Sequence, residues 1–322
     1  MVKVNDVLNI IYSISPYAIM YTIPLLITAL GGLFSERSGV VNIGLEGLMV
    51  IGSFASAFTI YSLQNTLPQQ EAVWIGIGVA VVVGALFSLL HAFASISLNA
   101  NQIISGTAIN MIAGGLTIFL ARNITGSGNI QIKTGLLGFD VPILKDIPFL
   151  GKILFTNTYW TTWLVILILI VGAFVLYRTP FGLRLRACGE HPQAADSAGV
   201  NVFAIRYIAV MISGAFAGLG GAAVLVTFSA EFNGSVFGLG FLALAALIFG
   251  QWKPLGILGA TVFFGFASTI ANVSQVIPSL DQIPGVLLKV FPYVVTLIAL
   301  VLLSKSSQAP RAAGEAFEHG KR

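Results

Sequence analysis

Long apolar runs separated by short polar segments extend over most of the sequence. Roughly 20 mostly apolar residues cross the hydrocarbon core of a bilayer, about 30 Å, as one helix. Eight runs qualify: residues 16–34, 43–63, 73–98, 103–121, 159–177, 203–228, 254–273 and 286–303. A ninth, 238–250, has 13 residues and glycine at both ends, which predicts a short tilted helix or a re-entrant segment buried in protein. The pattern predicts an all-α, polytopic membrane protein with eight to ten transmembrane helices.

Composition supports this class of protein. Of the 322 residues, 57% are hydrophobic and 9% are charged, and the mean hydropathy is +0.93, well above the values of soluble domains. The longest polar gaps, 122–158 and 178–206, leave no soluble insertion, so we expect one transmembrane domain over residues 1–303. Residues 304–322 contain almost no apolar side chains, which predicts a disordered cytoplasmic tail.

Basic residues give an orientation through the positive-inside rule. With nine spans, ten of the sixteen Lys and Arg residues fall on one side: Arg37, Arg178, Arg184, Arg186, Arg206, Lys253, Lys305, Arg311, Lys321 and Arg322. The other side holds Lys3, Arg122, Lys133, Lys145, Lys152 and Lys289. The loop 178–206 and the C-terminus are therefore expected in the cytoplasm and the N-terminus outside, although one extra half-span before Glu46 would reverse the side of the N-terminus.

Catalytic chemistry finds no support in the sequence. A phosphate-binding G-x-x-x-x-G-K-[ST] loop, an H-E-x-x-H zinc motif and a G-x-S-x-G nucleophile motif are all missing. Cys188 is the only cysteine, which excludes an internal disulfide and a cysteine-rich metal site. The net charge of +4 is scattered over loops and forms no basic stripe for nucleic acid. We expect no catalytic residue, metal or cofactor in this chain.

The loop 178–206 has the features of a docking surface. It contains four arginines, Pro180 and Gly182 near its start, and a run of small residues ending at Gly199. This combination predicts a short amphipathic helix that packs on a partner. A simple pore needs no such surface, whereas a transporter driven from outside the membrane does.

Polar residues inside apolar runs are costly in a bilayer and are candidates for function. Glu46 lies one turn after Asn42, between Gly44 and Gly47, so the two polar side chains share a helix face. Two interpretations stay open. Glu46 either fixes a helix terminus by hydrogen bonding to a neighbouring segment, or takes part directly in a pathway or gate.

Two further runs carry polar faces. Asn110 shares a helix face with Gly106 and Thr117, and Gln102 lies at the start of the same run. Ser268 and Asn272 form a similar face in the run 254–273. Each face either lines a polar conduit or makes hydrogen bonds between helices. For His91, which stands alone in its run, a hydrogen-bonded packing role is favoured over a proton relay. Small residues four apart, at Gly52 and Ser56 and again at Gly214 and Gly218, predict close helix packing.

Four segments of the sequence resemble membrane subunits of ATP-binding-cassette importers. They are SERSGVVNIGLEGLM (35–49), NQIISGTAINMIAGGLT (101–117), TPFGLRLRACGEHPQAADSAGVNV (179–202) and ALIFGQWKPLG (246–256). More narrowly, they are similar to the permease family of ribose, branched-chain amino acid and nucleoside uptake systems. Within it the shorter of two paired permeases in bacterial nucleoside importers is most similar.

The resemblance implies a role for several residues. The segment 179–202 matches the cytoplasmic coupling segment that sits in a groove of the ATPase, which assigns ATPase coupling to Arg184, Arg186, Gly189, Glu190, His191, Pro192, Ala195 and Gly199. The N-x-G-x-E-G pattern from Asn42 to Gly47 belongs near the translocation pathway in this fold. With the polar faces above, the candidate pathway residues are Asn42, Glu46, Gln102, Asn110, Ser268 and Asn272.

The implied machine is an alternating-access importer in a bacterial plasma membrane. Its other parts are a second homologous permease, a cytoplasmic ATPase that binds ATP and Mg, and an external substrate-binding lipoprotein. A nucleoside is the expected cargo, and a monosaccharide or branched-chain amino acid is the alternative. A different class of protein, a secondary transporter that works alone, would need a pair of ionisable groups in mid-membrane. The available groups, Glu46 and His91, lie on different spans with no evident pairing, which counts against that class.

Overall fold

The computed structural model describes residues 4–273, 286–287, 290–291, 294, 298 and 308–318. Its elements are helical apart from one short two-stranded ribbon. The helices are α1 (Val4–Arg37), α2 (Leu45–Leu63), α3 (Gln69–Ala92), α4 (Gln102–Thr125), α5 (Leu150–Leu154), α6 (Trp160–Arg178), α7 (Pro180–Glu190), α8 (Pro192–Ser197), α9 (Val202–Val224), α10 (Leu239–Phe249) and α11 (Pro254–Val273). One turn of π-helix extends α3 (Phe93–Ser97) and another extends α9 (Leu225–Ser229), and a short 3-10 helix, Leu144–Asp146, precedes α5. The strands β1 (Ile130–Gln131) and β2 (Glu231–Phe232) pair antiparallel.

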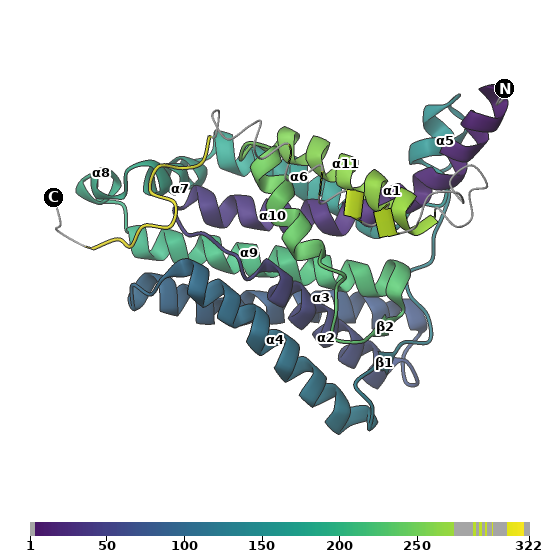
Figure 1. Ribbon diagram of the computed structural model, residues 1–322, viewed down its shortest axis with the longest axis horizontal. Helices are drawn as coiled ribbons and strands as arrows, with labels where there is room; N and C mark the ends of the chain where they lie inside the picture. The colour runs from purple at the N-terminus through teal and green to yellow at the C-terminus, as the bar shows by residue number, and fades with distance from the viewer. Residues whose placement is uncertain are drawn as a thin grey trace.

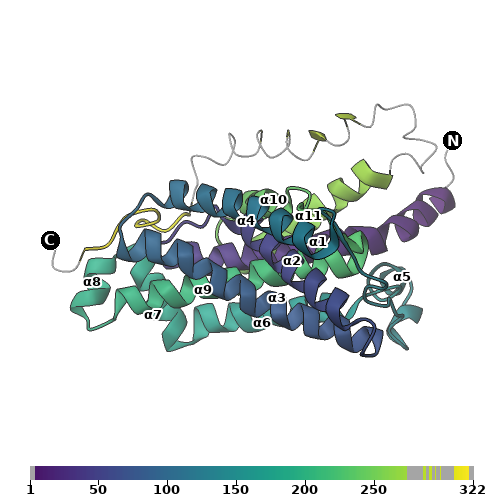
Figure 2. The ribbon, with the colours of Figure 1, turned by 90° about the horizontal axis from the view of Figure 1, so that it is seen from below.

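Four helices form the centre of a bundle. α9 packs against α1, α2 and α3, and α2 also packs along α3. α10 and α11 lie against α1, α6 lies against another side of α1, and α4 crosses α2 at the edge of the bundle (Figures 1 and 2). The main hydrophobic core follows from this arrangement, with Leu30, Leu48 and Leu225 among its fully buried side chains.

The expected class of fold is confirmed. Within the described residues, six helices are long and apolar enough to cross a membrane, and α10 and α11 contribute two shorter apolar stretches. Seven of the eight predicted runs coincide with helices, and the eighth, 286–303, falls mostly outside the described residues. The short run 238–250 forms α10, whose 11 residues make a helix of about 16 Å. That length is about half of the hydrocarbon core.

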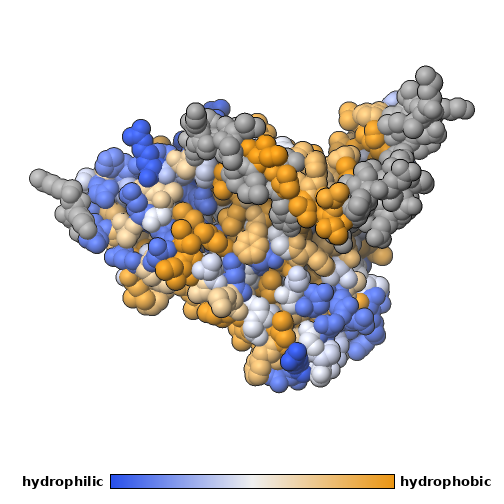
Figure 3. Space-filling model, in the orientation of Figure 1, coloured by the Kyte–Doolittle hydropathy of each residue, from blue (hydrophilic) through white to orange (hydrophobic). Residues whose placement is uncertain are grey.

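The predicted division of basic residues into two sides is visible in the fold. Arg37, the arginines of 178–206 and Lys253 lie at the end that carries α7, α8 and residues 308–318, called here the α7 end (Figure 1). Lys133, Lys145 and Lys152 belong to the opposite end, called the β end, with β1, β2 and α5. Hydrophilic residues gather at the α7 end and around the two strands, with a largely apolar surface between them (Figure 3).

Glycines permit the close approach of α3 and α9 that the small-residue spacing predicts. A Cβ on Gly84 would lie 2.4 Å from the Gly214 carbonyl oxygen, and one on Gly218 would lie 2.3 Å from the Ala80 carbonyl oxygen. Both distances are far inside van der Waals contact. In lipid, where apolar surfaces gain little from leaving the solvent, this backbone proximity supplies much of the packing between helices.

The C-terminal segment differs from the sequence prediction. Residues 308–318 were expected to be disordered, yet the Ala312 and Phe317 side chains are 4% and 3% exposed. The prediction is wrong for these residues because two apolar side chains and several backbone groups find partners on the α7 end. Composition alone does not reveal those partners.

Two valine substitutions on α3 test the close packing. Gly84→Val places side-chain atoms where the Gly214 carbonyl lies, and overpacking of this kind costs about 1–3 kcal/mol. Gly78→Val is the control, since no atom lies within 4 Å of the Cβ it would add. Thermal unfolding in detergent should show a lower midpoint for Gly84→Val and a nearly unchanged one for Gly78→Val. Equal midpoints would contradict the packing account.

Candidate functional site

Residues 38–44, called here the break, join α1 to α2 without helical structure. After α1 ends at Arg37, the chain turns back into the bundle and reaches the start of α2 (Figure 1). All residues of the break are buried except Val41 and Ile43, which are partly exposed. Non-helical backbone is tolerated inside a membrane protein only where protein or enclosed water satisfies its polar groups. The partners of this backbone therefore determine whether the break is stable.

The amides of the break have partners on both sides. Ser38 and Gly39 donate to carbonyls in the last turn of α1 at 3.0 and 2.9 Å, and the Val40 amide does so at 3.2 Å. The Val41 amide donates to Oε1 of Gln102 at the first residue of α4, at 2.6 Å. Gln102, a predicted pathway residue, is 4% exposed, so its amide group is used to hold the break.

The carbonyls of the break accept hydrogen bonds from six different donors. These run from Arg206 Nε to Ser38 (3.2 Å), from the Gly314 amide to Gly39 (3.1 Å), from Ser35 Oγ to Val40 (2.7 Å), from His91 Nε2 to Val41 (3.1 Å), from Asn110 Nδ2 to Ile43 (3.0 Å) and from the Leu48 amide to Gly44 (3.0 Å). Elements that are far apart in sequence thus donate hydrogen bonds to the backbone of the break. His91 also contacts Ser105 Oγ at 2.9 Å through Nδ1, which makes it the packing residue that the sequence favoured.

Asn42 and Asn110 fix the start of α2. The Oδ1 of Asn42 accepts from the Gly44 amide at 3.1 Å, and its Nδ2 donates to Ser213 Oγ of α9 at 2.9 Å. The Oδ1 of Asn110 accepts from the Gly47 amide at 2.7 Å. The first amides of a helix have no partner within the helix, and Asn110 supplies one from α4.

Glu46 supplies the same kind of partner to another helix. Its Oε1 accepts from the Gly238 amide at 3.1 Å and its Oε2 from the Gly240 amide at 2.7 Å. These amides lie at the N-terminus of α10, where the helix dipole also favours a negative charge. The geometry supports the interpretation in which Glu46 fixes a helix terminus. A Cβ on Gly240 would lie 2.4 Å from the Glu46 Cα, so α10 and α2 meet at backbone contact.

The other two candidate pathway residues lie elsewhere. Ser268 is 8% exposed, and a Cβ on the nearby Gly265 would lie 2.1 Å from Thr22 Oγ1, which places this stretch of α11 against α1. The side chain of Asn272 lies outside the described part of the chain. The structure therefore brings together Asn42, Glu46, Gln102 and Asn110 around the break and leaves Ser268 at a separate helix contact.

A partly exposed polar face lies beside these contacts. Glu46 and Asn110 are both partly exposed, and hydrophilic colours interrupt the apolar surface between α10 and α4 (Figure 3). Two aromatic side chains border α10 at its start: Phe237 is 51% exposed and Phe241 is 49% exposed. Sequence reasoning missed both. The sequence signal that could have indicated them is the short glycine-flanked run, because a helix of half the usual length starts inside the bundle.

The predicted coupling residues divide into two groups. In the described α7–α8 segment, Arg184, Glu190, His191 and Gly199 are exposed, whereas Gly189, Pro192 and Ala195 are buried. Arg186 is half-buried, with its Nε donating to the Leu176 carbonyl at 3.1 Å. The buried members contact this chain's own helices and so position the segment. A cleft of about 340 Å³, lined by Arg184, Gly199 and Asn201 among others, opens beside the exposed members.

Arg37 connects the coupling segment to α10. Its Nη1 lies 3.6 Å from Oε1 of Glu190 at the end of α7, and its Nη2 donates to the Trp252 carbonyl at 2.8 Å. Trp252 follows α10, and its Nε1 donates to the buried Glu36 at 2.6 Å. A Cβ on Gly189 would lie 2.3 Å from the Arg37 carbonyl. The end of α1 is thus enclosed by α7 and by the turn after α10.

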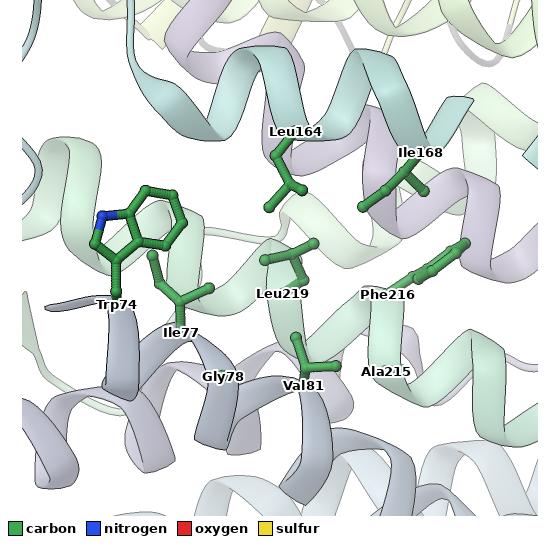
Figure 4. A pocket seen from close by; sticks show the side chains of 9 residues that line it. All are labelled: Trp74, Ile77, Gly78, Val81, Leu164, Ile168, Ala215, Phe216 and Leu219. Atoms are coloured by element: carbon green, nitrogen blue, oxygen red, sulfur yellow. The ribbon is translucent and has the colours of Figure 1, made fainter. Parts of the chain in front are cut away.

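One other cavity is chemically unsuited to a polar cargo. A pocket of about 340 Å³ lies between α3, α6 and α9, lined by Trp74, Val81, Ile168, Phe216 and other apolar residues. The indole nitrogen of Trp74 is the one polar side-chain atom drawn on its wall (Figure 4). Within the described residues no three His, Cys, Asp or Glu side chains gather as a metal site requires.

Comparison with known proteins identifies the class to which this fold and these sites belong. The family "Branched-chain amino acid transport system / permease component" matches residues 16–300. The guanosine ABC transporter permease protein NupQ of Bacillus subtilis is 47% identical, covering 98% of this chain and 100% of the relative. The nucleoside ABC transporter permease protein NupC of Lactococcus lactis is 41% identical over 96% of this chain and 98% of its own.

A further relative is the guanosine ABC transporter permease protein NupP of Bacillus subtilis, 26% identical over 75% of this chain and 69% of its own length. The chain is therefore a multi-pass membrane protein of the permease class. It belongs to the branched-chain amino acid transport system / permease component family. Its relatives are transport subunits and not enzymes, as the sequence predicted.

Substitution of Glu46 tests its capping role. Glu46→Leu leaves the Gly238 and Gly240 amides without their acceptor, which costs about 1–3 kcal/mol for each unsatisfied group. Glu46→Gln retains one acceptor oxygen and should lose less stability. Thermal midpoints in detergent should therefore fall in the order wild type, Gln, Leu. Glu71→Leu is the control, because this exposed glutamate also lies in the first turn of a helix. A wild-type midpoint for Glu46→Leu would refute the capping role.

Proposed function

We propose that the chain is one of two paired permease subunits of an ATP-driven nucleoside importer in a bacterial plasma membrane. The observation that carries the proposal is the 47% identity, over essentially the full length of both chains, to a guanosine permease. Bacillus subtilis has two such guanosine permeases that match this chain, NupQ and NupP, which supports a second, more distant permease as partner. An ATPase that binds ATP and Mg and an external lipoprotein that delivers substrate complete the machine.

The face between α10 and α4 supports a cargo with a flat ring and hydrogen-bonding edges. Phe237 and Phe241 offer exposed aromatic rings, and a base stacked on an aromatic side chain gains about 1–3 kcal/mol. Asn110 and Glu46 lie partly exposed on the same side of the bundle. A nucleoside carries no net charge, so this face needs no buried counter-ion. The face is the part of the translocation pathway that this subunit contributes.

The α7 end is the ATPase-facing, cytoplasmic end. Arg184, Glu190 and His191 are exposed there, Arg184 also lines the cleft beside α7, and a groove on the ATPase fits a helix pair presented in this way. Force applied to α7 reaches the end of α1 through Glu190 and Arg37, and reaches α10 through the Trp252 carbonyl. Because these contacts tie α7 to α1 and α10, movement of α7 carries the helices that border the break with it, and the switch between discrete packings falls at the interface between the two permeases.

Substrate affinity in the permease can be low in this mechanism. ATP supplies the driving free energy, and the external protein supplies specificity. A monosaccharide or a branched-chain amino acid remains the alternative cargo for the same machine. Neither carries the flat ring that Phe237 and Phe241 would stack on, so cargo competition discriminates between them.

Uptake measurements test the proposed function. The test uses proteoliposomes that contain both permeases and the ATPase, with the binding lipoprotein outside. They should take up labelled guanosine when ATP is enclosed in the lumen, the side that corresponds to the cytoplasm. Excess unlabelled nucleoside should compete, whereas ribose, glucose and leucine should not. Phe241→Ala should raise the KM for guanosine roughly tenfold, the factor expected for loss of one stacking contact. Phe174→Ala on α6, similarly exposed at 60%, is the control. Competition by leucine or a sugar alone would overturn the nucleoside assignment.

Cysteine labelling tests the orientation. Native Cys188 is 0% exposed and gives little background. A cysteine at exposed Lys145, at the β end, should react with an impermeant thiol reagent added to intact cells. A cysteine at exposed Ala316, at the α7 end, should react only after the membrane is permeabilised. The reverse pattern would place α7 outside the cell and exclude contact with a cytoplasmic ATPase.

A further inference from the structure

Residues 308–318, called here the strap, lie across the α7 end and touch two functional elements at once. The Ala312 amide donates to the Gly189 carbonyl of α7 at 2.9 Å. Two residues further on, the Gly314 amide donates to the Gly39 carbonyl of the break at 3.1 Å. The strap therefore bridges the coupling helix and the break through its own backbone. The family match ends at residue 300, so the strap lies beyond the segment that defines the permease family.

Arg206 of α9 adds a side-chain link between the break and the strap. It is 1% exposed, and its Nε donates to the Ser38 carbonyl at 3.2 Å while its Nη1 donates to the Glu315 carbonyl at 3.1 Å. A buried guanidinium is costly unless its donors are satisfied; Nε and Nη1 have backbone carbonyls of the break and of the strap as acceptors, whereas the buried Nη2 has no acceptor among the described residues. Removing the strap would leave Nη1 without this acceptor.

Phe317 closes the strap over the coupling segment. Its side chain is 3% exposed and belongs to a small apolar cluster with Cys188, Ala195 and Val202, which come from α7, α8 and α9. Its ring also meets Phe203 edge-on, with centroids 5.4 Å apart. One aromatic side chain thus packs where the three elements of the coupling region meet.

Other connections between α7 and the break are weaker. The Arg37–Glu190 pair is 3.6 Å long, with the two side chains 12% and 47% exposed, and an ion pair with one end open to solvent is weakened by screening. Gly189 contacts the end of α1 without a side chain. Without the strap, the end of α7 at Gly189 would lose its backbone bridge to the break.

We propose that residues 308–318 are a second coupling element, which fixes α7 and α8 to the break so that displacement of the coupling helix reaches α2 and α10. This role rests on the proposed function, since it assumes that a partner moves α7. The packing of the strap on α7 is independent of that function. The two parts of the proposal therefore need separate measurements.

Cys188 reports on the packing. In the native chain it is 0% exposed, and burial raises the pKa of its thiol to about 11, so little reactive thiolate forms at neutral pH. A chain truncated after residue 307 and the point variant Phe317→Ala should both label with maleimide in detergent at roughly tenfold or higher rates, because local opening exposes the thiol. A chain ending at Glu318 keeps the whole strap and is the control, with the wild-type rate expected.

Coupling is measured on the same variants in the reconstituted complex. Phe317→Ala and the truncation should hydrolyse ATP at near wild-type rates but take up several-fold less guanosine per ATP, and the chain ending at Glu318 should behave as wild type. Wild-type labelling of Cys188 in both variants would overturn the packing. Faster labelling with unchanged uptake per ATP would overturn the coupling role. Loss of uptake in the wild-type complex would instead refute the proposed function, and the labelling result would still decide the packing.

Discussion

Seven residues of largely buried, non-helical backbone impose the main constraint on this structure. Between α1 and α2 the chain leaves the helix inside the bundle, where a missing hydrogen bond cannot be replaced by bulk water. The structure meets this demand with side chains from several helices, including Gln102, His91, Asn110 and Arg206. Because those side chains come from α3, α4 and α9, satisfying the break also fixes how these helices sit around α2. These four polar side chains thus lie where the non-helical backbone needs partners.

The same arrangement links the two ends of the proposed mechanism. Glu46 holds the N-terminus of α10 against the start of α2, and the far end of α10 leads to Trp252, which Arg37 contacts. Arg37 in turn faces Glu190 on α7, and the strap adds its backbone bridge between α7 and the break. A closed circuit of contacts therefore runs from the coupling segment through α1, α10 and α2. Such a circuit transmits displacement as a rigid unit, since close-packed elements deform little.

The sequence predicted the class of fold, the helical runs and the polar residues that matter, because hydropathy and charge act locally. For Glu46 and for Asn110 it left two roles open, a place in the translocation pathway or hydrogen bonding between segments. Only their long-range partners decide between these roles. Gly238 and Gly240 lie nearly 200 residues from Glu46, and no local sequence pattern predicts that contact. The strap was missed for the same reason. Phe317 is one aromatic residue in a polar tail, and its burial depends on a cavity built by three other elements.

Distances between spin labels test the rigid-unit account most directly. Labels replace exposed Leu183 on α7 and exposed Phe241 at the start of α10, and the buried native cysteine stays unlabelled. In the assembled importer, the distance within this chain should stay the same between the nucleotide-free and ATP-trapped states. The distance from the Phe241 label to a label on the partner permease should change. A changed distance within the chain, with no change between the two permeases, would contradict the account.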